Sequence, residues 1–167
     1  ADRAWRAAGV TTIFLGLGRN IYPAVNLPRG LAELETLLGP LARSAVYEGA
    51  AMGFAGDPFW NLVVSATTDL SVGGLQAAIR EIEYRHGRAL DAVRNSPRAL
   101  DIDMLSFGDA VGEIDGVILP RGEILEHAFV LRPLAELAPD IPHPQLQTSY
   151  AELWAAFDQA SQPLSRV

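Results

Sequence analysis

Residues 98–107, which read Arg-Ala-Leu-Asp-Ile-Asp-Met-Leu-Ser-Phe, alternate apolar and acidic side chains. This two-residue period is typical of a β-strand and predicts that Leu100, Ile102 and Met104 share one face. Asp101 and Asp103 then share the other face, and two positions along a strand separate them by roughly 6–7 Å. The run therefore predicts a strand with one face in a core and two neighbouring carboxylates on its opposite face.

The carboxylate pair is the first candidate functional feature. Two like charges this close raise each other's pKa unless a cation lies between them. Mg²⁺ is usually held by one or two carboxylates plus substrate phosphates, and Arg98 places a planar charged fork suited to phosphate beside the pair. The pair is also consistent with the solvated face of an amphipathic sheet, and the spacing alone favours that simpler interpretation.

Composition narrows the classes of function. The chain has 167 residues, and we expect a single domain over 1–167 with tails at 1–9 and 158–167. Cysteine is absent, which excludes disulfides and Cys-ligated zinc. All 13 basic residues are Arg, so a P-loop lysine and Schiff-base chemistry are excluded. The net charge of −7 argues against nucleic-acid binding, and no apolar run is long enough for a membrane span. With no secretory signal evident, we expect a cytoplasmic protein, monomeric or weakly oligomeric.

The basic residues are concentrated in one part of this acidic chain. Residues 80–98 hold five Arg against three acidic residues, and an anionic ligand would be drawn to this segment.

Periodicity and turn residues predict the order β-α-β-β-α-β. The strands are expected at 10–17, 43–49, 59–68 and 98–107, and the helices at 31–38 and 71–86. A further helix is expected at 129–137, and Gly- and Pro-rich loops at 49–58 and 90–97. The order predicts an α+β fold with a ferredoxin-like βαββαβ core and a mainly antiparallel sheet.

Asn61 is a polar residue in the otherwise apolar strand at 59–68. A buried amide needs hydrogen-bond partners. Two interpretations stay open: a structural bond to neighbouring backbone, or pairing with the edge of a flat heterocycle beside the aromatic ring of Phe59.

Five motifs in matching order resemble the 6-hydroxymethyl-7,8-dihydropterin pyrophosphokinase family. Residues 97–108 resemble its Gly-Pro-Arg-x-Leu-Asp-Leu-Asp signature, and residues 14–20 its opening strand. Residues 59–64, 82–88 and 129–139 resemble three further motifs. The resemblance covers about residues 10–155 and implies helices on both faces of the sheet.

The resemblance also implies an activity and its ligands. The family transfers pyrophosphate from ATP to the hydroxymethyl group of a reduced pterin, releases AMP, and serves folate or related pterin biosynthesis. It implies two Mg²⁺ ions held by Asp101 and Asp103 and catalytic roles for Arg88, Arg98, Asp101 and Asp103. The implied ATP contacts are Arg80, Glu83, Arg88, Arg98, Ile102, Arg121 and His127. The implied pterin contacts are Gly49, Ala50, Met52, Phe59, Asn61, Asp101 and Phe129.

Several positions depart from the family pattern. The family's Gly-Ser-Asn becomes Gly18-Arg19-Asn20, and Arg80 stands where Gln is common. The family's His followed by Arg is reversed here, with Arg121 first and His127 second. Three hypotheses follow. The first is a Mg²⁺- and ATP-dependent pterin diphosphokinase. The second is a non-catalytic pterin- or nucleotide-binding paralogue. The third is a different metal-dependent phosphoryl-transfer enzyme or a ferredoxin-like regulatory domain.

Overall fold

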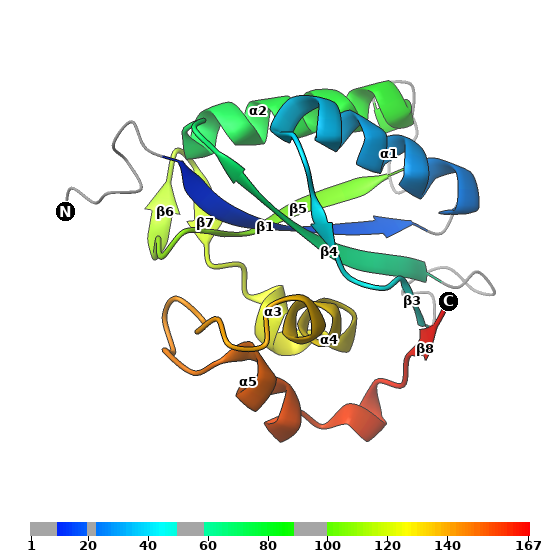
Figure 1. The fold of residues 1–167 in the computed structure, drawn as a ribbon, viewed down its shortest axis with the longest axis vertical. Helices are drawn as coiled ribbons and strands as arrows, with labels where there is room; N and C mark the ends of the chain where they lie inside the picture. The colour runs from blue at the N-terminus through cyan, green and yellow to red at the C-terminus, as the bar shows by residue number, and fades with distance from the viewer. Residues whose placement is uncertain (1–9, 20–22, 50–58, 89–99) are drawn as a thin grey trace.

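The computed structural model describes residues 10–19, 23–49, 59–88 and 100–167, without the side chains of Pro23, Gly87 and Arg88. An antiparallel sheet lies at its centre (Figure 1). Strand β1 (Thr11–Arg19) lies between β4 (Phe59–Thr68) and β5 (Asp101–Phe107). Beyond β4 come β3 (Tyr47–Gly49) and β8 (Ser165–Arg166), while the short β2 (Ala42–Arg43) also pairs with β4.

Helices cover both faces of the sheet (Figure 1). Helix α1 (Pro23–Leu38) and helix α2 (Val72–Glu83), which continues as the π-helix η2 (Tyr84–Arg88), lie on one face. Helices α3 (Glu123–Glu126), α4 (Ala128–Leu137) and α5 (Tyr150–Ala156) lie on the other. A hairpin of β6 (Gly112–Ile114) and β7 (Val117–Leu119) leads into α3, and the 3-10 helix η3 (Gln159–Ser161) precedes β8.

Strand alternation divides the apolar side chains between two cores. Ile13, Leu15 and Leu17 of β1 are buried with residues of α1 and α2, whereas Phe14 is buried with residues of α3, α4 and α5. Along the second face, Phe14 is followed by Gly16 and Gly18. This face of β1 therefore loses its side chains toward the end of the strand, and the second core does not extend there.

A β-bulge shapes β5 after its acidic residues. Phe14 pairs with Ser106 while Leu15 pairs with Met104, so Leu105 is the extra residue in β5. Leu105 belongs to the second core, whereas Phe107 belongs to the first. Because the bulge follows Asp103, the predicted alternation over residues 100–104 is preserved, and Leu100, Ile102 and Met104 all lie in the first core.

The structure confirms three parts of the sequence prediction: a mixed α and β fold, an antiparallel sheet, and helices on both faces of the sheet. Three details were wrong. The helix expected at 31–38 begins at Pro23, where a missing N–H costs little. The strand expected at 43–49 is two short strands, β2 and β3. Residues 158–167, expected to be a tail, form η3 and the strand β8 that pairs with β3.

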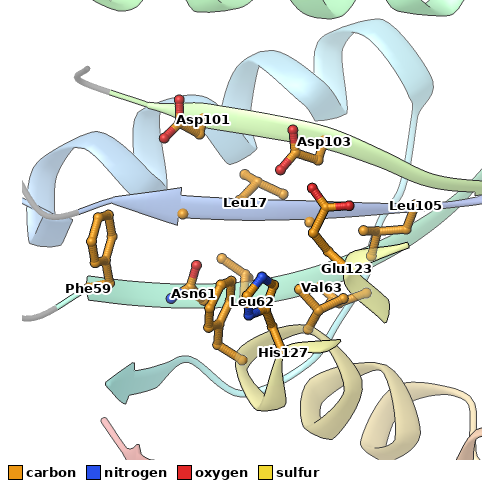
Figure 2. A pocket seen from close by; sticks show the side chains of 14 residues that line it. Leu17, Phe59, Asn61, Leu62, Val63, Asp101, Asp103, Leu105, Glu123 and His127 are labelled. Atoms are coloured by element: carbon orange, nitrogen blue, oxygen red, sulfur yellow. The ribbon is translucent and has the colours of Figure 1, made fainter. Parts of the chain in front are cut away.

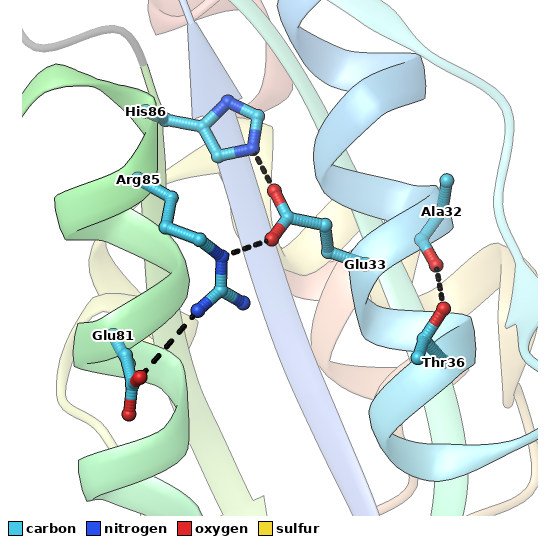
Figure 3. Close-up of polar contacts among 6 residues, drawn as sticks. All are labelled: Ala32, Glu33, Thr36, Glu81, Arg85 and His86. Atoms are coloured by element: carbon cyan, nitrogen blue, oxygen red, sulfur yellow. Dashed lines mark hydrogen bonds and ion pairs between the residues drawn. The ribbon is translucent and has the colours of Figure 1, made fainter.

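Polar contacts join α1 to the end of α2 (Figure 3). The carboxylate of Glu33 accepts hydrogen bonds from the Nε of Arg85, at 2.6 Å, and from the Nε2 of His86. Burial by itself would raise the pKa of Glu33, but the hydrogen bonds and charges of these two residues hold it below its ordinary value. The contact fixes η2 against α1 just before Arg88.

No helix within the described ranges has the length and apolar character that a membrane crossing requires.

Candidate active site

A cavity of about 230 Å³ opens where the second core stops short of the strand ends. It lies between the sheet and the junction of α3 with α4 (Figure 2). Its lining residues come from β1, β4, β5 and that junction: Gly16, Leu17, Gly18, Phe59, Asn61, Leu62, Val63, Asp101, Asp103, Leu105, Glu123, His127, Phe129 and Val130.

The two aspartates face this cavity from β5, on the same side of the strand (Figure 2). In the antiparallel register, Gly18 of β1 pairs with Asp101 and Gly16 pairs with Asp103. Cross-strand neighbours on one face of a sheet normally fill the space beside each other. Because both neighbours are glycines, the space beside the carboxylates stays open. The pair predicted from the sequence is therefore brought together at a cavity.

Four charged groups act on Asp103, namely Arg121, Asp101, Glu123 and Arg80. An NH2 nitrogen of Arg121 lies 3.6 Å from its carboxylate, and the Nε of Arg121 donates to Glu123 at 3.0 Å. Burial raises the pKa of Asp103 above its ordinary value, the charge of Arg121 opposes that rise, and the charges of Asp101 and Glu123 add to it. The cavity thus concentrates negative charge around Asp103, whose pKa is already raised by burial.

These carboxylates fit the donor chemistry of Mg²⁺. The ion takes oxygen ligands and commonly binds through one or two carboxylates together with substrate phosphates. Within the described part of the chain, no group of three or more His, Cys, Asp or Glu side chains could hold a metal. Asp101 and Asp103 therefore fit an ion that is shared with a bound phosphate, and not one held by protein ligands alone.

Arg19 places a positive charge near the first of the two aspartates. Its side chain is only 1 % exposed at the end of β1. Burial lowers the pKa of Arg19, and the charge of Asp101 opposes that lowering. This arginine stands where the family pattern has Ser, so the departure adds a buried cation whose charge acts on Asp101.

Asn61 points its amide into the cavity from β4 (Figure 2). The residue is 8 % exposed, and its side chain has no hydrogen bond to any residue in the described ranges. A Cβ built on Gly18 would lie 2.5 Å from the Oδ1 of Asn61, so Gly18 leaves room for the amide. The structural bond considered from the sequence is not found in the described ranges. The arrangement favours the alternative, in which the amide pairs with a ligand in the cavity.

Aromatic residues border the same cavity. Phe59 lies on β4 beside Asn61, and Phe129 lies in the first turn of α4. The ring of His127 stacks on that of Phe129 with centroids 4.7 Å apart and an interplanar angle of 14°. Rings beside a buried amide are suited to a flat heterocycle, because the faces stack while the amide pairs with an edge.

A second cavity, of about 390 Å³, lies between α2, β7 and α3. Arg80 and Arg121 both border it, together with Gln76 and residues of the β6–β7 turn. Glu123 borders both cavities, and the charge of Arg80 also acts on Asp103. The two cavities therefore adjoin, one mainly acidic at Asp101 and Asp103 and the other basic.

Glu83 makes a structural contact with the strand that carries Ile102. Glu83 is buried, and its Oε2 accepts a hydrogen bond from the backbone N–H of Ile102 at 2.9 Å. The side chain of Ile102 lies in the first core, so only its backbone could contact a nucleotide. Glu83 satisfies a donor on β5, which is the last strand at its edge of the sheet.

Some predicted site residues are not brought to the cavity or cannot be placed. Gly49 pairs with Phe59 between β3 and β4 but does not line the cavity. Arg98, Ala50 and Met52 lie outside the described residues, as does the side chain of Arg88.

Sequence reasoning missed other residues that line the cavity, among them Gly16, Gly18, Leu105 and Glu123. The alternation of β1 could have indicated the two glycines. No local pattern marked Glu123.

Comparison with known proteins gives the site a context. Residues 14–139 match the family described as 7,8-dihydro-6-hydroxymethylpterin-pyrophosphokinase (HPPK). The chain is 38% identical over 136 residues to a 2-amino-4-hydroxy-6-hydroxymethyldihydropteridine pyrophosphokinase of Methylorubrum extorquens, covering 79% of this chain and 85% of that one. It is 34% identical over 139 residues to the protein of the same name in Pseudomonas aeruginosa, covering 81% and 85%.

Longer proteins also contain a similar region. The chain is 30% identical over 141 residues to the folic acid synthesis protein FOL1 of Dictyostelium discoideum, covering 83% of this chain but only 21% of that protein. A crystal structure of wild-type Plasmodium falciparum HPPK-DHPS with pterin and p-hydroxybenzoate superposes with a TM-score of 0.69 at 14% identity, covering 89% of this chain and 43% of that one. At that identity the structural likeness concerns the fold alone.

Proposed function

The chain belongs to the 7,8-dihydro-6-hydroxymethylpterin-pyrophosphokinase family, and we propose that it transfers pyrophosphate from ATP to the hydroxymethyl group of 6-hydroxymethyl-7,8-dihydropterin. The reaction releases AMP and supplies folate or related pterin synthesis. One observation carries the proposal. Asp101, Asp103 and Asn61 all face one cavity with aromatic walls, and the Asn61 amide has no hydrogen bond to any residue that the structure describes.

The cavity suits the pterin. Its ring would lie between Phe59 and Phe129, with the Asn61 amide paired to the ring edge. The hydroxymethyl group would then reach toward Asp101, across the open space left by Gly18. Ala50 and Met52 complete this pterin assignment by resemblance, as does Gly49.

The second cavity suits the nucleotide. Arg80 and Arg121 border it and would contact the anionic part of ATP, while His127 lies on the side of the first cavity. Glu83 and the backbone of Ile102 are assigned to the nucleotide by resemblance. Because the two cavities adjoin at Glu123, the phosphate chain would lie next to the pterin hydroxyl.

The transfer needs alignment and charge stabilisation more than covalent help from the protein. Asp101 and Asp103 would hold two Mg²⁺ ions, which when bound neutralise phosphate charge and favour attack by the hydroxyl. Arg121 would orient phosphate oxygens from the nucleotide side, while Arg88 and Arg98 are assigned the phosphate clamp by resemblance. Excluding water from the apolar floor of the cavity would direct transfer to the pterin hydroxyl.

A direct experiment tests this function. The protein is incubated with ATP, Mg²⁺ and 6-hydroxymethyl-7,8-dihydropterin, and AMP release is measured with and without the pterin and the metal. Release that needs both supports the proposal, and release that is independent of the pterin contradicts it. The same assay separates the enzyme from a non-catalytic paralogue. That alternative is favoured by Arg121, whose charge near Asp103 would compete with a metal ion.

The order of the strands in the sheet also indicates a more specific fold. We propose a ferredoxin-like βαββαβ core in a single domain. It is supported by the element order β1, α1, β3, β4, α2, β5 and by the sheet order β5-β1-β4-β3. A cytoplasmic location and a monomeric or weakly oligomeric state are part of the same proposal. Light scattering and cell fractionation would test them.

A further inference from the structure

The side chain of Gln162, just after η3, bridges the junction of α3 and α4. Its Oε1 accepts a hydrogen bond from the backbone N–H of Ala128 at 2.9 Å. Its Nε2 donates to the backbone carbonyl of Glu126 at 3.0 Å. The single amide therefore contacts the backbone on both sides of His127, across more than thirty residues of sequence.

Both of these backbone groups belong to helix ends. Glu126 is the last residue of α3 and Ala128 is the first of α4, and the last carbonyls and first N–H groups of a helix have no partner within it. His127 occupies the N-cap position of α4, but its side chain makes no capping hydrogen bond. Gln162 thus supplies a cap that the local sequence does not provide.

The capped junction carries one wall of the candidate site. His127 lies between the two hydrogen bonds, and its ring stacks on Phe129, which follows Ala128 directly. Both rings line the cavity proposed for the pterin. A change in the backbone at Glu126 or Ala128 would therefore move the aromatic wall relative to Asn61 and Phe59.

The segment that carries Gln162 is also attached to α4 and to β3, the strand that pairs with β4 at Phe59. The carbonyl of Leu164 accepts a hydrogen bond from Arg132 at 3.4 Å, and β8 then pairs with β3. The side chain of Leu164 packs close to Gly49, whose partner across the sheet is Phe59. The C-terminal segment 159–167 therefore spans from the α3–α4 junction to the strand next to Phe59.

We infer that Gln162 is a positioning residue for the aromatic ligand site. It fixes His127 and Phe129 at the spacing from Phe59 that a flat ring needs, without touching the ligand. This inference rests on the proposed function for the identity of the ring as a pterin. The geometric part, the dependence of the Phe129 wall on Gln162, stands on the hydrogen bonds alone.

Gln162→Met tests the inference, because it keeps the length of the side chain and removes both hydrogen bonds. We expect the Kd for 6-hydroxymethyl-7,8-dihydropterin, measured by calorimetry with Mg²⁺ and a non-hydrolysable ATP analogue, to rise about fivefold or more. We expect the KM for ATP to stay unchanged. Gln162→Glu keeps the acceptor for Ala128 and should fall between Gln162→Met and the unaltered protein.

Gln159→Ala is the matched control. Gln159 lies in the same segment and donates to the carbonyl of Trp154 at 3.0 Å, away from the cavity, so its loss should leave pterin binding unchanged. A pterin Kd in Gln162→Met equal to that of the unaltered protein would overturn the inference. So would an equal rise in Gln159→Ala, because a general loosening of the segment would then explain the effect.

Amide hydrogen exchange separates this inference from the proposed function. Gln162→Met should speed exchange at Ala128 and shift the ring resonances of His127 and Phe129 in the protein without ligand. If the unaltered protein binds no pterin but these changes occur, the pterin assignment is wrong and the positioning role stands for another flat ligand. If exchange and ring resonances are unchanged, the positioning role is wrong whichever ligand binds.

Discussion

The guanidinium of Arg121 lies 3.6 Å from the carboxylate of Asp103, at the boundary between the acidic cavity and the basic one. The Nε of the same guanidinium donates a 3.0 Å hydrogen bond to Glu123. A fixed cation next to a carboxylate that is proposed to bind metal can orient phosphate without moving far. This relationship makes Arg121 the described residue best placed to connect the two substrates.

Replacing Arg121 by Ala should slow pyrophosphate transfer by roughly 10²-fold, the usual loss for a group that stabilises developing charge. Steady-state measurement of AMP release would determine kcat and the KM for ATP. Arg43→Ala is the control, because Arg43 forms a surface ion pair with Glu35 on β2 and α1. A rate near that of the unaltered protein would remove Arg121 from the phosphate site.

Mg²⁺ binding should weaken as the pH falls. The weakening should begin at a higher pH than at a site whose aspartate has an ordinary pKa. Burial raises the pKa of Asp103, and the ion requires the ionised carboxylate. The charge of Arg121 opposes this rise, so Arg121→Ala should move the loss of binding to still higher pH. Titration of Mg²⁺ with an ATP analogue at a series of pH values measures the Kd. A profile identical in both proteins would contradict the electrostatic coupling.

Asp103→Asn should abolish Mg²⁺-dependent turnover and at the same time stabilise the fold at neutral pH. The pKa of Asp103 is raised in the folded protein, so ionisation of its carboxylate disfavours folding once the pH exceeds the pKa of the unfolded chain. A neutral amide removes that penalty. The gain should be small because the side chain is 49% exposed. Urea unfolding measures it. A turnover equal to that of the unaltered protein in both Asp103→Asn and Asp101→Asn would exclude the metal assignment.

Gly18→Ala should weaken pterin binding about tenfold or more, because the added Cβ would lie 2.5 Å from the Oδ1 of Asn61 and displace the amide. Gly16→Ala is the matched comparison on the same face of β1. Its Cβ would meet Leu105 at 3.5 Å, an ordinary contact, so its effect on the pterin Kd should be much smaller. Equal effects of the two substitutions would argue against a specific role for the Asn61 amide.

The sequence predicted the parts of this site that depend on local alternation. Asp101 and Asp103 on one face of β5, and Phe59 and Asn61 together on β4, follow from a two-residue period. The register of β1 against β5 depends on pairing between distant segments, so the position of Gly18 opposite Asp101 could not be predicted locally.

Contacts made by isolated side chains were also beyond the sequence. The residues around Gln162 have no strand or helix period, and β8 has only two residues. Its pairing with β3 depends on the position of the sheet edge that the rest of the fold creates. Glu123 likewise reaches the cavity only because α3 is placed there by the β6–β7 hairpin.

His143 should make the stability of the protein depend on pH in mildly acidic solution. Its ring is 2% exposed, and its Nδ1 accepts hydrogen bonds from the backbone N–H groups of Gln145, at 3.2 Å, and Leu146, at 3.1 Å. Burial lowers the pKa of His143 below the value of 6.5 expected in the unfolded chain. The unfolded chain therefore binds the proton more tightly than the folded protein does. The contribution of neutral His143 to the free energy of unfolding is complete above pH 6.5 and is lost as the pH falls toward the pKa of the folded protein.

His143→Asn tests this dependence, because an Asn side-chain oxygen can accept the same backbone hydrogen bonds but does not titrate. The free energy of unfolding, measured with urea at a series of pH values, should fall more steeply below pH 6.5 in the unaltered protein than in the variant. The difference in slope cannot exceed about 1.4 kcal/mol per pH unit for one proton. Parallel curves would show that His143 binds a proton equally well in the folded and unfolded states, contrary to its burial beside Tyr150.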